Sequence, residues 1–209
     1  MGCKKTVGER NCLSPLIMSC DLSFKGEEDS DHCGFVLMGL LHPDAKGDER
    51  NHPHGKAQGR PIAPPVRELE IEVLWAARHR FGLPETVKFL LASMSALQQQ
   101  GLKPDAVLIE DAANGPAVLQ LLRRKVPGLL PITARGSKES RAHAVAPLLE
   151  AGQVRFHHRA APLVEELPRF PKGSKDLVDA FGHGALWLEA RYWRGLGLKQ
   201  GPMPLLLSR

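Results

Sequence analysis

The stretch that most constrains this chain is Val107-Leu-Ile-Glu-Asp-Ala-Ala-Asn-Gly-Pro116. A short aliphatic run reaches two carboxylates and stops at Asn-Gly-Pro, which predicts a buried strand followed by a turn and a helix. Glu110 is therefore expected at the carboxyl end of a strand, where open α/β sheets usually bind their ligands. Asp111 follows it, and we interpret Asp111 as structural and Glu110 as the functional candidate.

The rest of the chain alternates between strand and helix patterns. Two apolar runs, Leu16–Asp21 and Cys33–Leu41, are joined by a short polar loop, which predicts a β-hairpin. The order of elements predicts an α/β fold with a mixed sheet, antiparallel in its first strands and parallel later, with flanking helices. We expect further strands at 66–80, 127–133 and 154–156, helices at 84–100, 116–125 and 141–152, and a last helix through 194 after a proline-rich bend.

The length of 209 residues favours one domain with a single substantial core. We expect a flexible lead-in over 1–15, a folded domain over 16–194 and a tail over 195–209. The four cysteines form no Cys-x-x-Cys pair, so we interpret them as reduced thiols in a cytosolic setting. No apolar run approaches the roughly 18 to 20 residues of a membrane helix, so no membrane partner is expected.

Four carboxylates stand where they could share a metal ion. Asp21 closes an apolar run as Glu110 does, and Asp176 and Asp179 open the last helix on one face. An oxygen-only site prefers Mg²⁺ or Mn²⁺ to zinc. Two such ions about 4 Å apart could support phosphodiester hydrolysis. Alternatively, the two helix-start aspartates are caps or dipole partners, and the strand-end acids are merely solvated.

Basic residues between the second acid and the third could form a path for DNA. They could contact backbone phosphates without reading sequence, and the formal net charge of +5 is compatible with such a partner. The alternative is a solvated helix face with cations at helix ends. We interpret His52, His54, His157 and His158 as loop histidines. The candidate DNA contacts are Arg123, Arg124, Arg135, Lys138 and Arg141, of which Lys138 and Arg141 share a helix face and are preferred.

From Val107 onward the sequence resembles the C-terminal nuclease domain of tailed-phage terminase large subunits. Cys20-Asp-Leu-Ser-Phe-Lys25 with Ser30-Asp31 is similar to the opening strand and loop of that domain. The resemblance spans roughly residues 16–191, and it is the ordered combination of motifs that is specific. The other matching motifs are Ile109-Glu-Asp-Ala-Ala-Asn-Gly-Pro-Ala117, Leu122-Arg, Val126-Pro-Gly128, Gly136-Ser-Lys-Glu-Ser-Arg-Ala142, Ala146-Pro-Leu-Leu-Glu-Ala-Gly-Gln-Val154, Phe170-Pro and Asp176-Leu-Val-Asp-Ala180.

The resemblance implies a ribonuclease-H-like fold and a metal-dependent endonuclease that cuts concatemeric phage DNA during packaging in the bacterial cytoplasm. It implies double-stranded DNA as substrate, and the terminase small subunit and portal protein as possible partners. By motif, Asp21 corresponds to the first acid and Glu110 to the second. The family pattern His-Asp-Asp-x-x-Asp-Ala reads here as Ser174-Lys-Asp-Leu-Val-Asp-Ala180, so either Asp176 or Asp179 could be the third acid. Lys175 replaces an aspartate, and its charge would repel the metal ions.

Terminase large subunits also carry a packaging ATPase. This sequence has no Gly-x-x-x-x-Gly-Lys-Ser/Thr motif to cradle nucleotide phosphates, so we expect an isolated nuclease domain, excised or prophage-encoded, without ATP-driven translocation. Two alternatives stay open. One is a catalytically impaired DNA-binding prophage remnant, and the other is a resolvase-type nuclease on the same fold.

Overall fold

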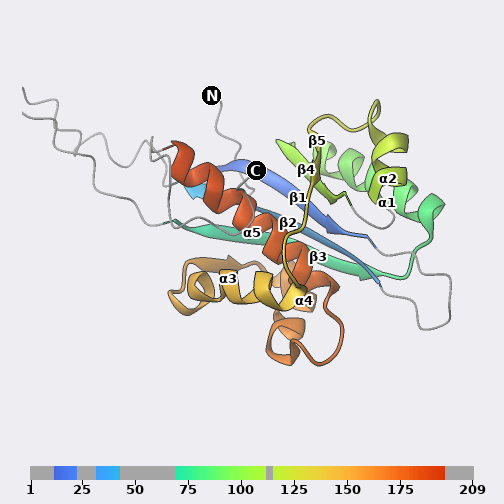
Figure 1. Ribbon diagram of the computed structural model, residues 1–209. Coiled ribbons are helices and arrows are strands. Elements are labelled where there is room, and N and C mark those ends of the chain that lie inside the picture. The colour runs from blue at the N-terminus through green and yellow to red at the C-terminus, as the bar shows by residue number, and fades with distance from the viewer. Residues whose placement is uncertain (1–11, 23–31, 43–68, 112–114, 196–209) are drawn as a thin grey trace, which may run out of the picture.

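A computed structural model describes residues 12–22, 32–42, 69–111 and 115–195, and these form one mixed sheet flanked by helices (Figure 1). The strand order is β5-β4-β1-β2-β3-β6. The predictions for His52 and His54 fall outside the described residues. The strands are β1 (Cys12–Asp21), β2 (Cys33–His42), β3 (Ile71–His79), β4 (Ala106–Glu110), β5 (Leu129–Ile132) and β6 (Val154–Phe156), and the helices are α1 (Leu83–Gln99), α2 (Gly115–Leu122), α3 (Lys138–Glu150), α4 (Ala161–Glu166) and α5 (Asp176–Gly195).

The sheet has the predicted mixed character. Strands β1 and β2 form the expected antiparallel hairpin, in which Asp21 pairs with Gly34. Strand β3 adds to β2 in the antiparallel sense. Strands β4 and β5 continue the sheet in parallel on the other side of β1, and β6 is parallel to β3. Because β1, β4 and β5 run in the same direction, their carboxyl ends lie at one edge of the sheet.

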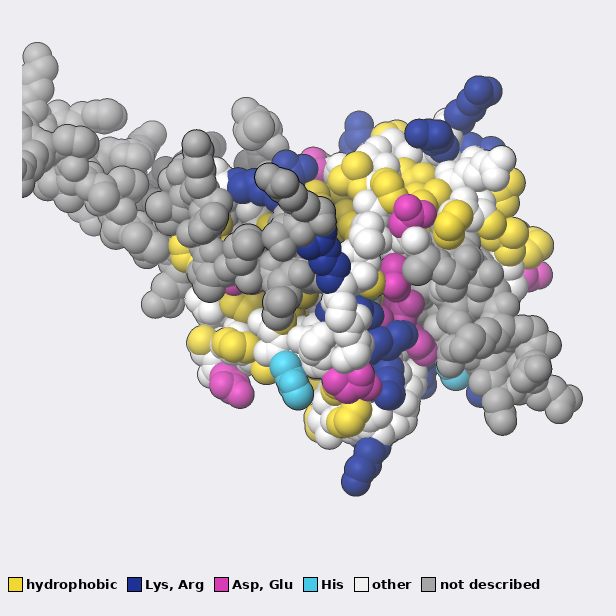
Figure 2. Space-filling model, viewed as in Figure 1, with side chains coloured by type: hydrophobic (Ala, Val, Ile, Leu, Met, Phe, Trp, Pro, Cys, Tyr) yellow, Lys and Arg dark blue, Asp and Glu magenta, His cyan; other side chains and the backbone are white. Residues whose placement is uncertain are grey.

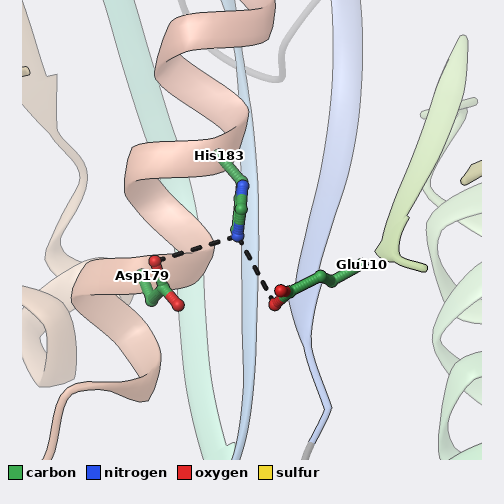
Figure 3. Close-up of side chains that lie close together, drawn as sticks. All are labelled: Glu110, Asp179 and His183. Atoms are coloured by element: carbon green, nitrogen blue, oxygen red, sulfur yellow. Dashed lines mark ion pairs between the residues drawn. The ribbon is translucent and has the colours of Figure 1, made fainter. Parts of the chain in front are cut away.

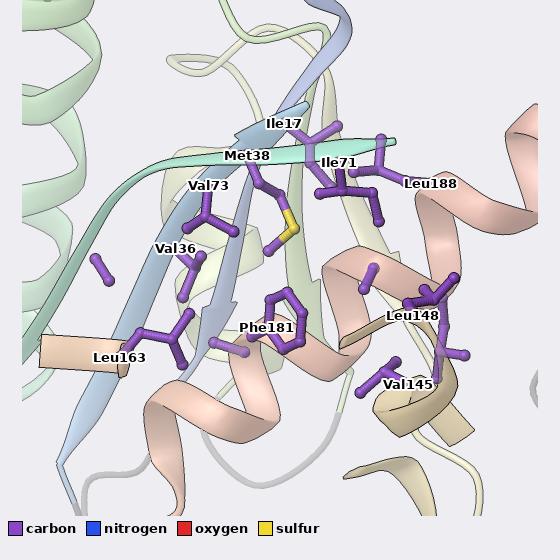
Figure 4. Close-up of a cluster of buried hydrophobic side chains, with 14 of the residues drawn as sticks. Ile17, Val36, Met38, Ile71, Val73, Val145, Leu148, Leu163, Phe181 and Leu188 are labelled. Atoms are coloured by element: carbon purple, nitrogen blue, oxygen red, sulfur yellow. The ribbon is translucent and has the colours of Figure 1, made fainter. Parts of the chain in front are cut away.

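Each face of the sheet carries its own core, because successive side chains of a strand point to opposite faces. On one face, Ile17, Val36 and Met38 pack with Phe181 of α5 and with residues of α3 and α4 (Figure 4). On the other face, Met18 and Phe35 belong to a second cluster that includes residues of α1 and α2. Helix α5 lies across the middle of its face, so its first turn reaches the edge where β1 and β4 end (Figure 1).

The segment before α5 differs from the expected proline-rich bend. It contains the short helix α4, flanked by 3₁₀ turns at His158–Ala160 and Leu167–Arg169. A proline is compatible with the first turn of a helix, so Pro162 stands in the first turn of α4 rather than preventing it. A helix of six residues is too short to show a hydrophobic period, and its stability comes from packing, here through buried Leu163.

Candidate metal centre at the sheet edge

Two carboxylates stand at the ends of neighbouring strands. Asp21 is the last residue of β1 and Glu110 the last residue of β4. The two strands are parallel and Cys20 lies opposite Ile109, so Asp21 and Glu110 follow side by side at the same edge. The predicted position of Glu110 at a strand end is confirmed.

The first turn of α5 brings Asp176 and Asp179 to this edge, and a close approach to the hairpin makes this possible. A Cβ at Gly34, the residue paired with Asp21, would collide with the carbonyl oxygen of Asp176. Only glycine leaves room for the helix start at this point. Asp176 and Asp179 are both buried, and both lie in the first turn as the sequence predicts.

A buried glutamate from α4 also holds the start of α5. One carboxylate oxygen of Glu166 accepts hydrogen bonds from the backbone N–H groups of Leu177 (2.9 Å) and Val178 (3.1 Å). The other oxygen accepts from Arg78 of β3 at 2.9 Å. Glu166 thus satisfies helix N–H groups that lack an intrahelical partner, and its charge is favourable at a helix N-terminus.

The ammonium group of Lys138 lies among three of the acids. Its Nζ is 2.6 Å from Oδ2 of Asp21, 3.4 Å from Oδ2 of Asp179 and 3.5 Å from Oδ1 of Asp176. Lys138 is the first residue of α3, a helix capped by the Ser137 hydroxyl, which accepts from the Ser140 N–H. Burial would lower the pKa of Lys138, but the surrounding carboxylates raise it above its usual value.

Arg141 lies one turn further along α3 and forms an ion pair with Asp179. Its Nε donates to Oδ1 at 2.7 Å and its Nη2 to Oδ2 at 2.6 Å, the paired geometry that suits guanidinium and carboxylate. Nη1 donates to the carbonyl oxygen of Gly136 at 3.0 Å. The Arg141 side chain is 5% exposed and that of Asp179 is fully buried, so this is an interior ion pair.

His183 completes the cluster, and sequence reasoning missed it. Its Nε2 lies 3.6 Å from Oε2 of Glu110 and 3.8 Å from Oδ1 of Asp179, pointing between them (Figure 3). One ligand atom from each of the three residues lies within 4.8 Å of the others. The spacing of four residues from Asp179 puts both on one helix face, and this was the available sequence signal.

The donor set fits a divalent cation. The Nε2 atom of His183 is buried and has no hydrogen-bond partner among the described residues. Buried polar atoms are nearly always satisfied, so an imidazole nitrogen that lacks a partner among the described residues and faces two carboxylates is available as a metal ligand. Carboxylate oxygens with one imidazole nitrogen suit several divalent ions, whereas the sequence predicted oxygen ligands alone.

The two ends of this cluster differ in their electrostatics. We call Asp21, Asp176 and Lys138 the lysine end, and Glu110 and His183 the histidine end, with Asp179 between them. Burial raises the pKa of Asp21 to about 7, and the nearby carboxylates add to this while Lys138 opposes it. At the other end, the His183 imidazole holds the pKa of the half-buried Glu110 below its usual value.

The predicted DNA contacts separate into three groups in space. Arg135 follows β5, whose last residues pair with Ile109 and Glu110, so it lies at the edge of the candidate site. Lys138 and Arg141 turn their charges into the acid cluster. Arg123 and Arg124 are exposed after α2, close to the start of β4, where the carbonyl of Gly128 accepts from Val107. These two arginines therefore stand at the opposite end of β4 from Glu110.

Lys175 is paired outside the acid cluster. Its Nζ donates to Oε1 of Glu139 on α3 at 2.9 Å, and both side chains are partly exposed. This hydrogen bond lowers the pKa of Glu139 to about 2. The positive charge of Lys175 therefore has its own carboxylate partner. On the molecular surface, acidic and basic side chains lie next to one another near the middle of this face (Figure 2).

The remaining sequence candidates lie elsewhere. His157 accepts a hydrogen bond from the N–H of Arg159 through Nδ1, which agrees with its interpretation as a loop histidine. Cys20 and Cys33 are both buried and are not joined in a disulfide. Within the described ranges, no helix has the length and apolar character needed to span a membrane.

Part of this arrangement lies in a region that matches a known family. Residues 91–186 match the family model of the terminase RNaseH-like domain. The structure resembles the large terminase of a thermophilic bacteriophage, solved alone and with ADP, at a TM-score of 0.53 and 14% identity over 82% of this chain. This chain spans 39% of the length of that terminase. No curated protein matches the sequence.

The large terminase nuclease of thermophilic phage G20c, solved with bound zinc, has 15% identity over 87% of this chain and 89% of its own, at a TM-score of 0.48. The family match covers Glu110, the α3 residues Lys138 and Arg141, and the first turns of α5. Residues 91–186 are therefore similar to the terminase RNaseH-like domain, and the fold resembles that of part of a large terminase.

Proposed function

We propose that this chain is a Mg²⁺- or Mn²⁺-dependent DNA endonuclease of the terminase type, which cuts concatemeric phage DNA during genome packaging in the bacterial cytoplasm. The observation that carries the proposal is the convergence of Asp21, Glu110, Asp179 and His183 at one sheet edge. The Nε2 atom of His183 has no hydrogen-bond partner among the described residues. The match to the terminase RNaseH-like domain supports DNA as the substrate. The small subunit and the portal protein are the partners that this role would require.

The residues of the site would have different roles in binding a cation. Glu110, Asp179 and His183 would hold a divalent cation, and Asp21 and Asp176 would extend the negative surface around it. A bound cation would activate a water molecule and stabilise the leaving oxygen of a phosphodiester. Arg141 would keep Asp179 ionised and in place, since a buried carboxylate needs a paired charge.

Phosphate contacts would come from the rim of the site rather than from its interior. Arg135 stands at the correct edge, whereas the charges of Lys138 and Arg141 are engaged with acids. Arg123 and Arg124 could contact only a DNA segment that passes the other end of β4. Such contacts position the backbone without reading sequence, so binding should weaken as salt rises.

The test is nicking of supercoiled plasmid DNA with Mn²⁺ by the wild type, Asp21→Asn and Glu110→Gln. We expect both variants to lose cleavage by at least about a hundredfold, since Glu110 would bind the cation and Asp21 adds to the negative charge that attracts it. Asp111→Asn is the matched control, because Asp111 is exposed and adjacent to Glu110. It should cut as the wild type does, and unchanged cleavage by both site variants would refute the assignment.

One observation favours a second candidate, a DNA-binding protein with impaired catalysis. Lys175 stands where the family pattern has an aspartate, and the structure pairs it with Glu139. This candidate predicts salt-dependent DNA retention without Mn²⁺-dependent cleavage, and gain of cleavage by Lys175→Asp. Comparison of a four-way junction with linear duplex would separate the terminase-type activity from a resolvase on the same fold, which should prefer the junction.

A further inference from the structure

The charges around the acid cluster do not fit two divalent ions. Asp21, Glu110, Asp176 and Asp179 contribute four carboxylates, and Lys138 and Arg141 contribute two cations in direct contact with them. With all four carboxylates ionised, the formal balance is two negative charges, which one divalent cation neutralises. A second divalent ion would leave an excess of positive charge in the cluster. Such an excess is unfavourable because buried charge is costly unless it is compensated.

The geometry places these charges at separate ends. Lys138 lies within 3.5 Å of one oxygen each of Asp21, Asp176 and Asp179, which are oxygens that a metal ion would otherwise use. The histidine end has no lysine or arginine in hydrogen-bonding contact with Glu110 among the ion pairs of the described residues, and there the His183 nitrogen has no partner. The histidine end is therefore the position at which a bound cation would satisfy a buried polar atom.

A metal ion at the lysine end would compete with the Lys138 ammonium for the same carboxylate oxygen of Asp21. The Lys138 Nζ is 2.6 Å from Oδ2 of Asp21. A Mg²⁺ ion binds a carboxylate oxygen at about 2.0–2.1 Å, so an ion on the same oxygen would stand close to the ammonium and be repelled by it. Lys138 is the first residue of α3, and the N-cap residue Ser137 stabilises this end of the helix.

We propose that Lys138 is a built-in monovalent cation that fills the lysine end, so that the chain binds one divalent ion, at Glu110, Asp179 and His183. A second ion binds only when Lys138 is removed or withdrawn from Asp21. This inference rests on the proposed metal-dependent function and concerns the number of ions and their place. The sequence predicted two divalent ions. We infer instead one divalent ion and the ammonium group of Lys138.

Isothermal titration of the full chain with Mn²⁺ alone, without DNA, tests the proposal through stoichiometry. The wild type should bind one ion, and Lys138→Met, which keeps most of the aliphatic stem, should bind two. Lys138→Arg should retain one ion because the charge stays. Lys88→Met, a change of the same kind on the exposed side of α1, should match the wild type. Circular dichroism of each variant reports whether it is folded.

Two results would overturn the proposal. One is two ions in the wild type with Lys138 intact, a measurement that needs no variant to fold. The other is a single ion, with unchanged affinity, in folded Lys138→Met. Failure of the wild type to bind any Mn²⁺ would overturn the proposed metal-dependent function as well. Binding that is insensitive to position 138 would overturn only the role of Lys138.

Discussion

The lysine end and the histidine end of the candidate site lie on the same sheet edge but handle charge differently. At the lysine end, Asp21 and Asp176 face an ammonium that belongs to the chain. At the histidine end, Glu110 faces a buried imidazole nitrogen that has no hydrogen-bond partner among the described residues. Asp179 contributes to both ends, and Arg141 donates hydrogen bonds to both of its carboxylate oxygens.

The difference shows how a buried cluster of acids can fold before a ligand arrives. Two side-chain cations compensate two of its four carboxylate charges, because isolated buried charges would be very costly. The buried polar atom that is left without a partner among the described residues is Nε2 of His183, and leaving it unsatisfied costs stability. Sites that trade stability for binding in this way are common among functional sites. The two ends should therefore respond differently to substitution.

The largest expected effect comes from removing the guanidinium that holds the aspartate shared by both ends. Arg141→Met would leave buried Asp179 without its paired guanidinium and with only the Lys138 ammonium at 3.4 Å. Breaking such a buried pair typically costs about 3–5 kcal/mol. We expect a loss of this size in the free energy of unfolding, measured in urea at pH 7. Arg155→Met is the control, because the pair of Arg155 and Glu70 is largely exposed and should contribute at most about 1 kcal/mol. Equal losses for the two variants would contradict the interior role of Arg141.

The pH dependence of stability probes the lysine end. The pKa of Asp21 in the fold, about 7, lies above its ordinary value, so the fold favours the protonated carboxyl. Its contribution to stability is complete below about pH 4 and is lost as pH rises through 7. Asp21→Asn mimics the neutral form. Its free energy of unfolding should therefore rise relative to the wild type between pH 4 and 8, by on the order of a few kcal/mol.

Thermal or urea unfolding at several pH values measures this difference. If Asp21→Asn and the wild type lose stability in parallel across the range, the raised pKa is wrong. Mn²⁺ gives an internal control, because a cation near the cluster stabilises ionised carboxylates. Adding it at pH 8 should raise the stability of the wild type more than that of Asp21→Asn.

The next effect concerns metal affinity at the histidine end. His183→Leu removes an imidazole that faces Glu110 and Asp179, and loss even of groups that only support metal ligands commonly costs about 10- to 100-fold in affinity. Stability without metal should fall only by the loss of the favourable interaction with Glu110, whose pKa His183 holds below its usual value. Mn²⁺ titration and urea unfolding of the same sample report both quantities. His143→Leu on the exposed side of α3 is the control, and equal Mn²⁺ affinity of the two variants would exclude His183 as a ligand.

The smallest effect is expected at Lys175. Its ammonium pairs with Glu139, so Lys175→Ala should change the Mn²⁺ affinity by less than about threefold, as expected for a screened and partly exposed charge. An increase of tenfold or more would instead show that Lys175 repels the cation. That result would support the impaired protein over the active nuclease.

Much of the fold follows from local patterns in the sequence. The alternation of apolar residues identified the hairpin of β1 and β2, and the run from Val107 identified β4 with Glu110 at its end. Asp176 and Asp179 were expected at a helix start and lie there. The short helix α4 was not predicted, because six residues show no period. The roles of these acids as ligands remain predictions.

The sequence by itself determined which carboxylates stand at the ends of elements, since strand and helix limits follow from neighbouring residues. Only the tertiary structure decided their partners. Lys138 meets Asp21 across 117 positions of sequence, and Arg141 meets Asp179 across 38. Glu110 meets His183 only because α5 crosses the sheet where β4 ends. No local period encodes such encounters, because they depend on how helices pack on the sheet, and the division between a lysine end and a histidine end exists only in the folded chain.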